Sequence, residues 1–226
     1  MSKTHFLIID TAAEICSVSI SRGDVLIHSE ENQTPNSHAT SLTILIEKCM
    51  TDATVDYRDL QAICVHQGPG SYTGLRIGVS VAKGICYAYD IPLIGIDGLV
   101  GYGQAYLAQS TSNCDAVMVA IDARRDEVYG AIIHRDKSLF LETQPIIIDQ
   151  SFLAKIAHFQ QLDVLSNCPD KLVRLMNVNN IRIDRHFQFS ARYLNKYSYK
   201  MATQNFENNL AYFEPNYMKN SYIKKT

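Results

Sequence analysis

An internal repeat constrains the fold of this chain more than any other feature of its sequence. The stretch FLIIDTAAEICSVSIS (residues 6–21) is echoed by VMVAIDARRDEVYGAIIH (residues 117–134). Each copy has an apolar strand ending in Ile-Asp, a short polar turn and a second strand. The order strand–strand–strand–helix–strand–helix then follows twice, with the second copy eroded. This duplication predicts an α/β fold of two similar halves, each a mixed sheet flanked by helices.

The same patterns predict where the elements lie. In the first copy we expect strands at 5–10, 16–21, 25–31, 62–67 and 92–96, and helices behind a cap at Asn36 or Ser37, from Thr73 to about Ala88, and over 98–110. In the second copy we expect strands within 117–134 and at 139–148, and helices near 150–158, 170–177 and 189–201. The join falls around 108–116, so we divide the chain into an N-terminal half, residues 1–111, and a reduced C-terminal half, residues 112–226.

The most unusual local stretch, QGPGSYTGLRIGVSVAKG (residues 67–84), stands where a phosphate-binding loop would stand. It fits neither G-x-x-x-x-G-K-[ST] nor G-x-G-x-x-G, because Thr73 stands where each template starting at Gly68 needs a glycine. The nucleophile elbow G-x-S-x-G also fails, since Pro69 precedes Gly70-Ser71. We therefore interpret Ser71 as a turn or cap residue. An anion resting on the amides at the start of the following helix stays open as an alternative.

That helix carries a stripe of small residues, Gly74, Gly78, Ala82 and Cys86, each four positions apart. Two glycines inside a helix indicate a geometric need, because each costs up to about 1 kcal/mol relative to alanine. The stripe packs either on the chain's own sheet or against a partner helix. Polar character is confined to a second strip of residues: Arg76, Ser80, Lys83 and Tyr87.

Few residues have the spacing that metal or phosphate chemistry needs. The seven histidines form no H-x-x-x-H pair, so we expect no metal site. Asp10 and Asp122 each end a strand, where a carboxylate could either hold a magnesium ion with its nucleotide or cap the following turn. The six cysteines form no C-x-x-C pair, which favours buried thiols in a reducing compartment.

The charge and hydropathy of the chain indicate whether it binds nucleic acid or a membrane. The formal net charge of −2 gives no general attraction to nucleic acid. Arg192, Lys196 and Lys200 fall four apart on a predicted helix, where they could touch RNA or simply face solvent. Neither the N-terminus nor any apolar run has the length of a leader or a membrane span, so we expect a cytoplasmic protein with no membrane contact.

Six motifs together resemble the TsaB (YeaZ) family, relatives of TsaD and, more distantly, of the actin-like, sugar-kinase and Hsp70 superfamily. They are IIDTAAEICSVSI, HATSLTILI, GPGSYTGLRIGVSVAKG, PLIGIDGL, AIDARRDEVY and the terminal EPNYMKN, in the order and at the spacing of the family. The resemblance covers almost all of the first half, and only loosely residues 135–205. It implies an ASKHA fold with two ribonuclease-H-like halves.

The resemblance also implies a function. TsaB proteins are non-catalytic partners of TsaD, and with TsaE they support transfer of a threonylcarbamoyl group to the adenosine beside the tRNA anticodon. The expected partners are thus TsaD in a heterodimer and TsaE, with tRNA contacted through the complex. ATP or ADP and the metal are expected in those partners and not here, since Thr11-Ala12 replaces the glycine that follows the first aspartate of the superfamily's phosphate loop.

Within the family the first-half helices contact TsaD, and TsaB alone pairs with itself. Carried over, the interface would involve these residues: His38, Leu42, Leu45, Gly74, Leu75, Gly78, Val79 and Ala82. Asp10, Gly68, Gly70, Ser71 and Thr73 would form the motif turn. A Gly78→Leu protein would then fold normally and fail to bind TsaD. A glycoprotease-like peptidase and a small-molecule kinase are the alternative functions.

Overall fold

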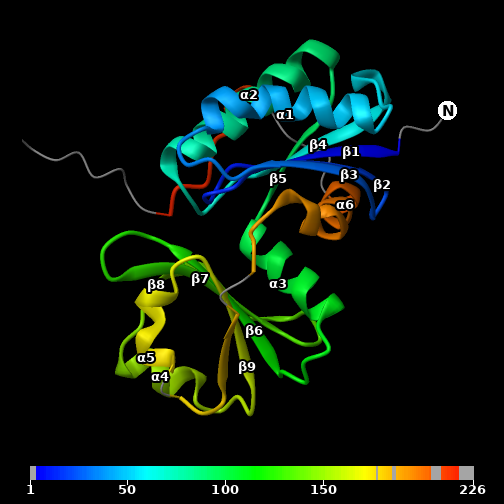
Figure 1. Ribbon diagram of the computed structural model, residues 1–226. Helices are drawn as coiled ribbons and strands as arrows, with labels where there is room; N and C mark the ends of the chain where they lie inside the picture. The colour runs from blue at the N-terminus through cyan, green and yellow to red at the C-terminus, as the bar shows by residue number, and fades with distance from the viewer. Residues whose placement is uncertain (1–3, 177, 185–186, 205–209, 219–226) are drawn as a thin grey trace, which may run out of the picture.

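The computed structural model describes residues 4–176, 178–184, 187–204 and 210–218. Its strands form two five-stranded mixed sheets with helices on their outer sides and between them (Figure 1).

The first sheet has the strand order β3-β2-β1-β4-β5. Its strands are β1 (His5–Asp10), β2 (Cys16–Arg22), β3 (Val25–Asn32), β4 (Leu60–His66) and β5 (Leu93–Ile96). β1 pairs antiparallel with β2 and parallel with β4, so the first three strands form a meander and the others follow crossovers. β1 is apolar and fully buried from Phe6 to Asp10, as expected of the central strand.

The second sheet repeats this topology. Its strands are β6 (Ala116–Asp122), β7 (Glu127–His134), β8 (Leu139–Ile147), β9 (Leu162–Ser166) and β10 (Ile181–Asp184). They run in the order β8-β7-β6-β9-β10, with β6 antiparallel to β7 and parallel to β9. Strand order and direction match the first sheet position by position, which confirms the duplicated fold that the repeat predicts.

Each sheet has helices on its outer side. α1 (His38–Asp52) and α2 (Tyr72–Tyr89) cover the first sheet, and α4 (Gln150–Ile156) and α5 (Val173–Met176) cover the second (Figure 1). The apolar stripe of α1 is buried over β2 and β3, as its spacing predicts. Two separate hydrophobic clusters result, one on the outer side of each sheet.

The layer between the sheets is made by helices that cross over. α3 (Gly98–Gln109) follows the first sheet in the chain but packs on β6 and β7, whereas α6 (Asn195–Gln204) follows the second sheet and packs on the first (Figure 1). Side chains of both sheets and both helices form one continuous cluster. The division at residues 111 and 112 separates the strands of the two sheets, but not these helices, and as a domain boundary it stays a prediction.

Four short 3-10 helices complete the described chain: η1 (Tyr57–Asp59), η2 (Pro169–Leu172), η3 (Ala191–Tyr193) and η4 (Leu210–Tyr212). The helix expected at 189–201 therefore begins only at Asn195, after η3. None of the helices in the described ranges combines the length and apolar character needed to cross a membrane.

Candidate functional site

The glycine-rich loop between β4 and α2 is held by the chain's own backbone. Gly68 has a φ of +133°, which favours glycine, and a side chain there would meet the carbonyl oxygen of Asn216 at 2.5 Å. Ser71 caps α2: its hydroxyl accepts a hydrogen bond from the amide of Gly74 at 3.2 Å. The amide of Ser71 in turn donates to the carbonyl of Ala12 at 2.8 Å. The predicted cap role of Ser71 is therefore confirmed.

The small-residue stripe of α2 lets this helix approach the turn after β1. The hydroxyl of Thr11 donates to the carbonyl of Gly74 at 2.7 Å. A methyl group on Gly74 would overlap the carbonyl oxygen of Thr11, and one on Gly78 would overlap the Thr11 hydroxyl. The glycines thus serve close packing inside the first half.

This packing corrects where sequence reasoning placed the interface residues. Seven of the eight are buried in the chain's own core: Leu42, Leu45, Gly74, Leu75, Gly78, Val79 and Ala82. His38 is half-buried, and its Nε2 lies 3.1 Å from the carbonyl of Ala13, beside the same turn. Helical spacing identifies which residues share a face but not what that face meets, and of the two alternatives left open by the sequence the structure shows packing within the chain. That α1 and α2 contact a partner stays a prediction.

The outer surface of α1 and α2 is formed by other residues. Ile44 of α1 is 63% exposed and Tyr87 of α2 is 85% exposed. Gly84 is also exposed, and no atom of the described residues stands within 4 Å of the position that its side chain would occupy. Arg76, Ser80 and Tyr87 of the polar strip face outward, so the strip was the sequence feature that marked this surface. Thr73, at the start of α2, is exposed as well.

The C-terminal segment 210–218 packs along α2. Lys83 donates from Nζ to the carbonyls of Ala211 and Phe213, at 3.1 and 3.0 Å. Arg76 donates from Nε to the Tyr217 hydroxyl at 2.9 Å and lies over the ring of Tyr72. Half of the polar strip, Arg76 and Lys83, therefore holds segment 210–218, which no local sequence pattern revealed.

Asp10, at the end of β1, belongs to a buried polar network. Its carboxylate accepts hydrogen bonds from the amide of Ala12 at 2.9 Å and from the Tyr102 hydroxyl of α3, and lies 3.0 Å from Nδ1 of His66. Burial by itself would raise the pKa of Asp10, but the charge and hydrogen bond of His66, with the hydroxyl and the amide, hold that pKa below its ordinary value. Burial first, and the Asp10 carboxylate second, raise the pKa of Tyr102. Asp10 thus links β1 to β4 and α3 and caps its own turn, with its carboxylate buried.

The cleft between the two halves is small and partly acidic. Its cavity has a volume of about 190 Å³ and is lined by residues that include Glu14, Asn167 and Phe189. The side-chain amide of Asn167 donates to the carboxylate of Glu14 at 3.1 Å, across the cleft. Asp122 accepts from the amide of Arg124 at 2.6 Å and forms an ion pair with Lys171, so it caps its turn too. A cavity of this size is below the roughly 300 Å³ of common ligand sites, and a carboxylate in its wall disfavours a phosphate.

The predicted basic face is not a single stripe. Arg192 lies in η3, outside α6, and forms an ion pair with Glu31 of β3. Lys196 and Lys200 of α6 are exposed. The guanidinium of Arg192 is thereby committed to a contact within the chain, and two exposed lysines remain.

The sequence of this chain is similar to those of known proteins. The family model "TsaD: tRNA N6-adenosine threonylcarbamoyltransferase" matches residues 25–225. The chain is 35% identical over 135 residues to the tRNA threonylcarbamoyladenosine biosynthesis protein TsaB of Escherichia coli, an alignment that covers 59% of this chain and only 57% of that protein. The TsaB protein of Buchnera aphidicola subsp. Acyrthosiphon pisum is 25% identical over 91% of this chain and 96% of its own length.

Solved structures agree on the fold. YeaZ from Pseudomonas aeruginosa superposes with a TM-score of 0.78 at 23% identity, over 94% of this chain and all of that one. An activator of 2-hydroxyisocaproyl-CoA dehydratase from Clostridium difficile, solved with ADPNP, superposes with a TM-score of 0.54 at 10% identity, over 89% and 96% of the two chains. These neighbours confirm the predicted actin-like ASKHA fold. The chain belongs to the TsaB (YeaZ) family of TsaD-related proteins of tRNA threonylcarbamoyladenosine biosynthesis.

Proposed function

We propose that this chain is the non-catalytic partner of TsaD and, with TsaE, supports transfer of the threonylcarbamoyl group to the adenosine next to the anticodon in tRNAs. The observation that carries the proposal is the outer surface of α1 and α2, where Ile44 of α1 and Tyr87 of α2 are exposed and Gly84 of α2 meets no other described residue. Large apolar side chains exposed together on neighbouring helices are typical of a protein-binding surface. Membership of a TsaD-related family favours TsaD as the partner.

The proposal assigns the chemistry to the partners. ATP or ADP and the metal belong to them, because here the carboxylate of Asp10 is engaged inside the chain and Glu14 stands in the wall of the cleft. Ser71 caps a helix, which does not favour a peptidase nucleophile. The chain works in the cytoplasm with reduced cysteines, and tRNA is contacted through the complex.

Reconstitution tests the proposal. Purified TsaD, TsaE, threonylcarbamoyl-adenylate and unmodified tRNA are combined with and without this chain, and the modified adenosine is measured by mass spectrometry. We expect modification only with the chain present, and binding of the chain to TsaD by calorimetry. Modification that proceeds equally well without the chain would refute the proposal.

A substitution on the outer surface locates the contact. Gly84→Arg places a long charged side chain into open space on α2, so the fold should persist while binding to TsaD falls at least about tenfold. Ala108→Arg, at an exposed position of α3, is the matched control and should bind as the parent does. If TsaD binding falls equally in both variants, or in neither, α2 is not part of the interface.

A further inference from the structure

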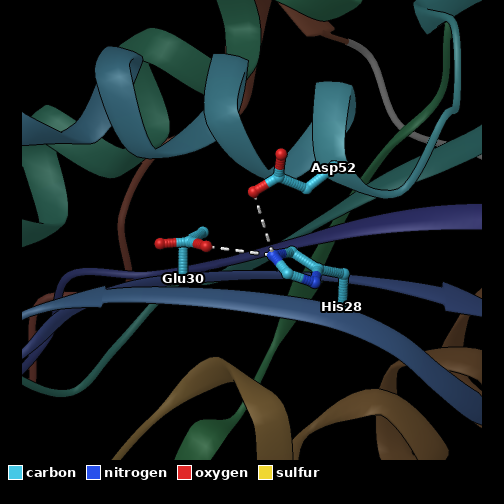
Figure 2. A group of neighbouring side chains, drawn as sticks. All are labelled: His28, Glu30 and Asp52. Atoms are coloured by element: carbon cyan, nitrogen blue, oxygen red, sulfur yellow. Dashed lines mark hydrogen bonds and ion pairs between the residues drawn. The ribbon is translucent and has the colours of Figure 1, made fainter.

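Three side chains converge between the edge strand β3 and the end of α1. His28 and Glu30 lie two residues apart on β3, so both project to the side of the sheet that α1 covers. Asp52 is the last residue of α1. Figure 2 shows the carboxylates of Glu30 and Asp52 directed at the same ring nitrogen of His28.

Two carboxylates lie close to the same nitrogen of His28, Nε2. Nε2 of His28 lies 2.9 Å from Oε1 of Glu30 and 3.6 Å from Oδ2 of Asp52. All three donor atoms lie within 4.8 Å of one another. An imidazole nitrogen carries at most one proton, so it donates one good hydrogen bond, here to the nearer carboxylate. Oδ2 of Asp52 then faces Nε2 of His28 without receiving a hydrogen bond from it.

The charges around these three side chains also favour a bound cation. Asp52 ends α1, where the helix dipole is negative, and the last turn contains no basic residue. Lys48 binds the other oxygen of Glu30, Oε2, at 2.9 Å. With Oε2 held by Lys48, the other oxygen of the carboxylate, Oε1, is the one directed at His28.

We propose that His28, Glu30 and Asp52 bind a divalent transition-metal ion, zinc by preference, that fastens the end of α1 to β3. Zinc lies about 2.0–2.2 Å from imidazole nitrogen and carboxylate oxygen, so two ligands at the tetrahedral angle are about 3.3–3.6 Å apart. The two separations from Nε2 of His28, 2.9 and 3.6 Å, lie near that range, and the oxygens of Glu30 and Asp52 are within 4.8 Å of each other. The nitrogen donor selects zinc over magnesium and calcium, which take oxygen ligands.

The site is open to ions from solution. The side chains of His28, Glu30 and Asp52 are 31%, 15% and 45% exposed, and a water molecule completes the fourth coordination position. The bound ion braces α1, a helix of the surface assigned above to TsaD, and it covers part of an edge strand that pairs only with β2 among the described strands. The proposal stands on the three side chains and does not rest on the proposed function.

Titration of the full-length protein tests the site. Protein freed of metal with a chelator is titrated with zinc chloride in a calorimeter, and its thermal unfolding is followed with zinc or with magnesium at the same concentration. We expect one zinc ion bound per chain, a midpoint of unfolding raised by zinc, and no effect of magnesium. His28→Gln and Asp52→Asn should each weaken zinc binding at least about tenfold, the loss typical even of a residue that only supports a ligand.

Controls separate this site from other zinc ligands. Glu47→Gln removes an exposed carboxylate from the same helix, outside the cluster, and should bind zinc as the parent does. X-ray absorption should show nitrogen and oxygen neighbours. No binding at about 100 micromolar zinc would overturn the proposal, as would sulfur neighbours or zinc binding that His28→Gln and Asp52→Asn leave unchanged.

Discussion

The glycines of α2 differ in what they face. Gly74 and Gly78 face Thr11, and a side chain at either position would overlap that residue. Gly84, further along the same helix, faces open space. The helical cost of glycine is therefore offset by packing at the first two positions, whereas at Gly84 no contact with a described residue offsets that cost.

We expect Gly78→Leu to destabilise the fold. The new side chain enters the space of the Thr11 hydroxyl, which is buried and hydrogen-bonded to Gly74, so the free energy of unfolding should fall by about 1–3 kcal/mol or more. Chemical denaturation followed by circular dichroism measures the change. This outcome replaces the expectation from sequence that the variant folds normally.

Gly84→Ala is the matched substitution in the same helix. Because its side chain meets nothing, the variant should gain about 0.4–1 kcal/mol in the free energy of unfolding from the reduced freedom of the unfolded chain. A Gly84→Ala protein as unstable as Gly78→Leu would show that packing against Thr11 is not the cause.

The buried carboxylate of Asp10 should make stability depend on pH in acid. Its pKa in the folded chain lies below the ordinary 3.8, so its contribution is complete above that pH and is lost as the pH falls through the folded value. Asp10→Asn should be less stable than the parent at pH 7, by about 1–3 kcal/mol, because buried partners lose a hydrogen bond. Denaturation between pH 2 and 7 should show a smaller acid loss in the variant, and identical pH profiles would contradict this role.

Among the elements, the C-terminal segment 210–218 depends on α2 for its position. Lys83 binds two of its carbonyls, and Leu210 and Phe213 pack against the outer cluster of the first sheet. The protein's last described residues thereby return to its first half, next to Gly68.

Lys83→Ala should loosen this segment without unfolding the chain. Two hydrogen bonds from a charged group are lost at a partly exposed site, so amide exchange in 210–218 should speed up while the global midpoint of unfolding changes little. Ser80→Ala, exposed on the same helix, should leave exchange in the segment unchanged. Unaltered exchange in Lys83→Ala would show that apolar contacts alone hold the segment.

At the scale of the whole molecule, the two halves are joined by an exchange of helices. α3 fits between α6 and the second sheet because it carries glycines where neighbours come close: Gly101 faces Leu194 and Gly103 faces Ile133. The inner cluster contains side chains from both sheets, so the halves share one core. The halves should therefore unfold together.

We also expect the isolated chain to form a homodimer through the outer surface of α1 and α2. Ile44 is exposed there, so self-pairing would bury it when TsaD is absent. Ile44→Arg should shift the chain toward monomer in light scattering at tens of micromolar, whereas Ile147→Arg, exposed on β8, should not. A parent protein that is strictly monomeric at that concentration would contradict the prediction.

Local pattern determined much of this protein. The repeat predicted two sheets of one topology, and the capping role of Ser71 followed from its place before the helix. The cap rests on interactions between neighbours in sequence, whereas the repeat transfers one strand order to both halves even though the pairings within each sheet join distant residues. The helix expected from residue 189 differs from the pattern: η3 (Ala191–Tyr193) precedes α6, and Arg192 in η3 pairs with Glu31 on the distant strand β3.

Only the tertiary structure decided what each face meets. The stripe of α2 was visible from its spacing, but its neighbour, Thr11, lies 63 residues before Gly74 in the chain. Asp10 stood at a strand end in the sequence, while His66 and Tyr102, which bind it, follow at 56 and 92 residues. Such pairings depend on how sheets and helices stack, and a periodic pattern specifies the face of an element but not the partner that buries it.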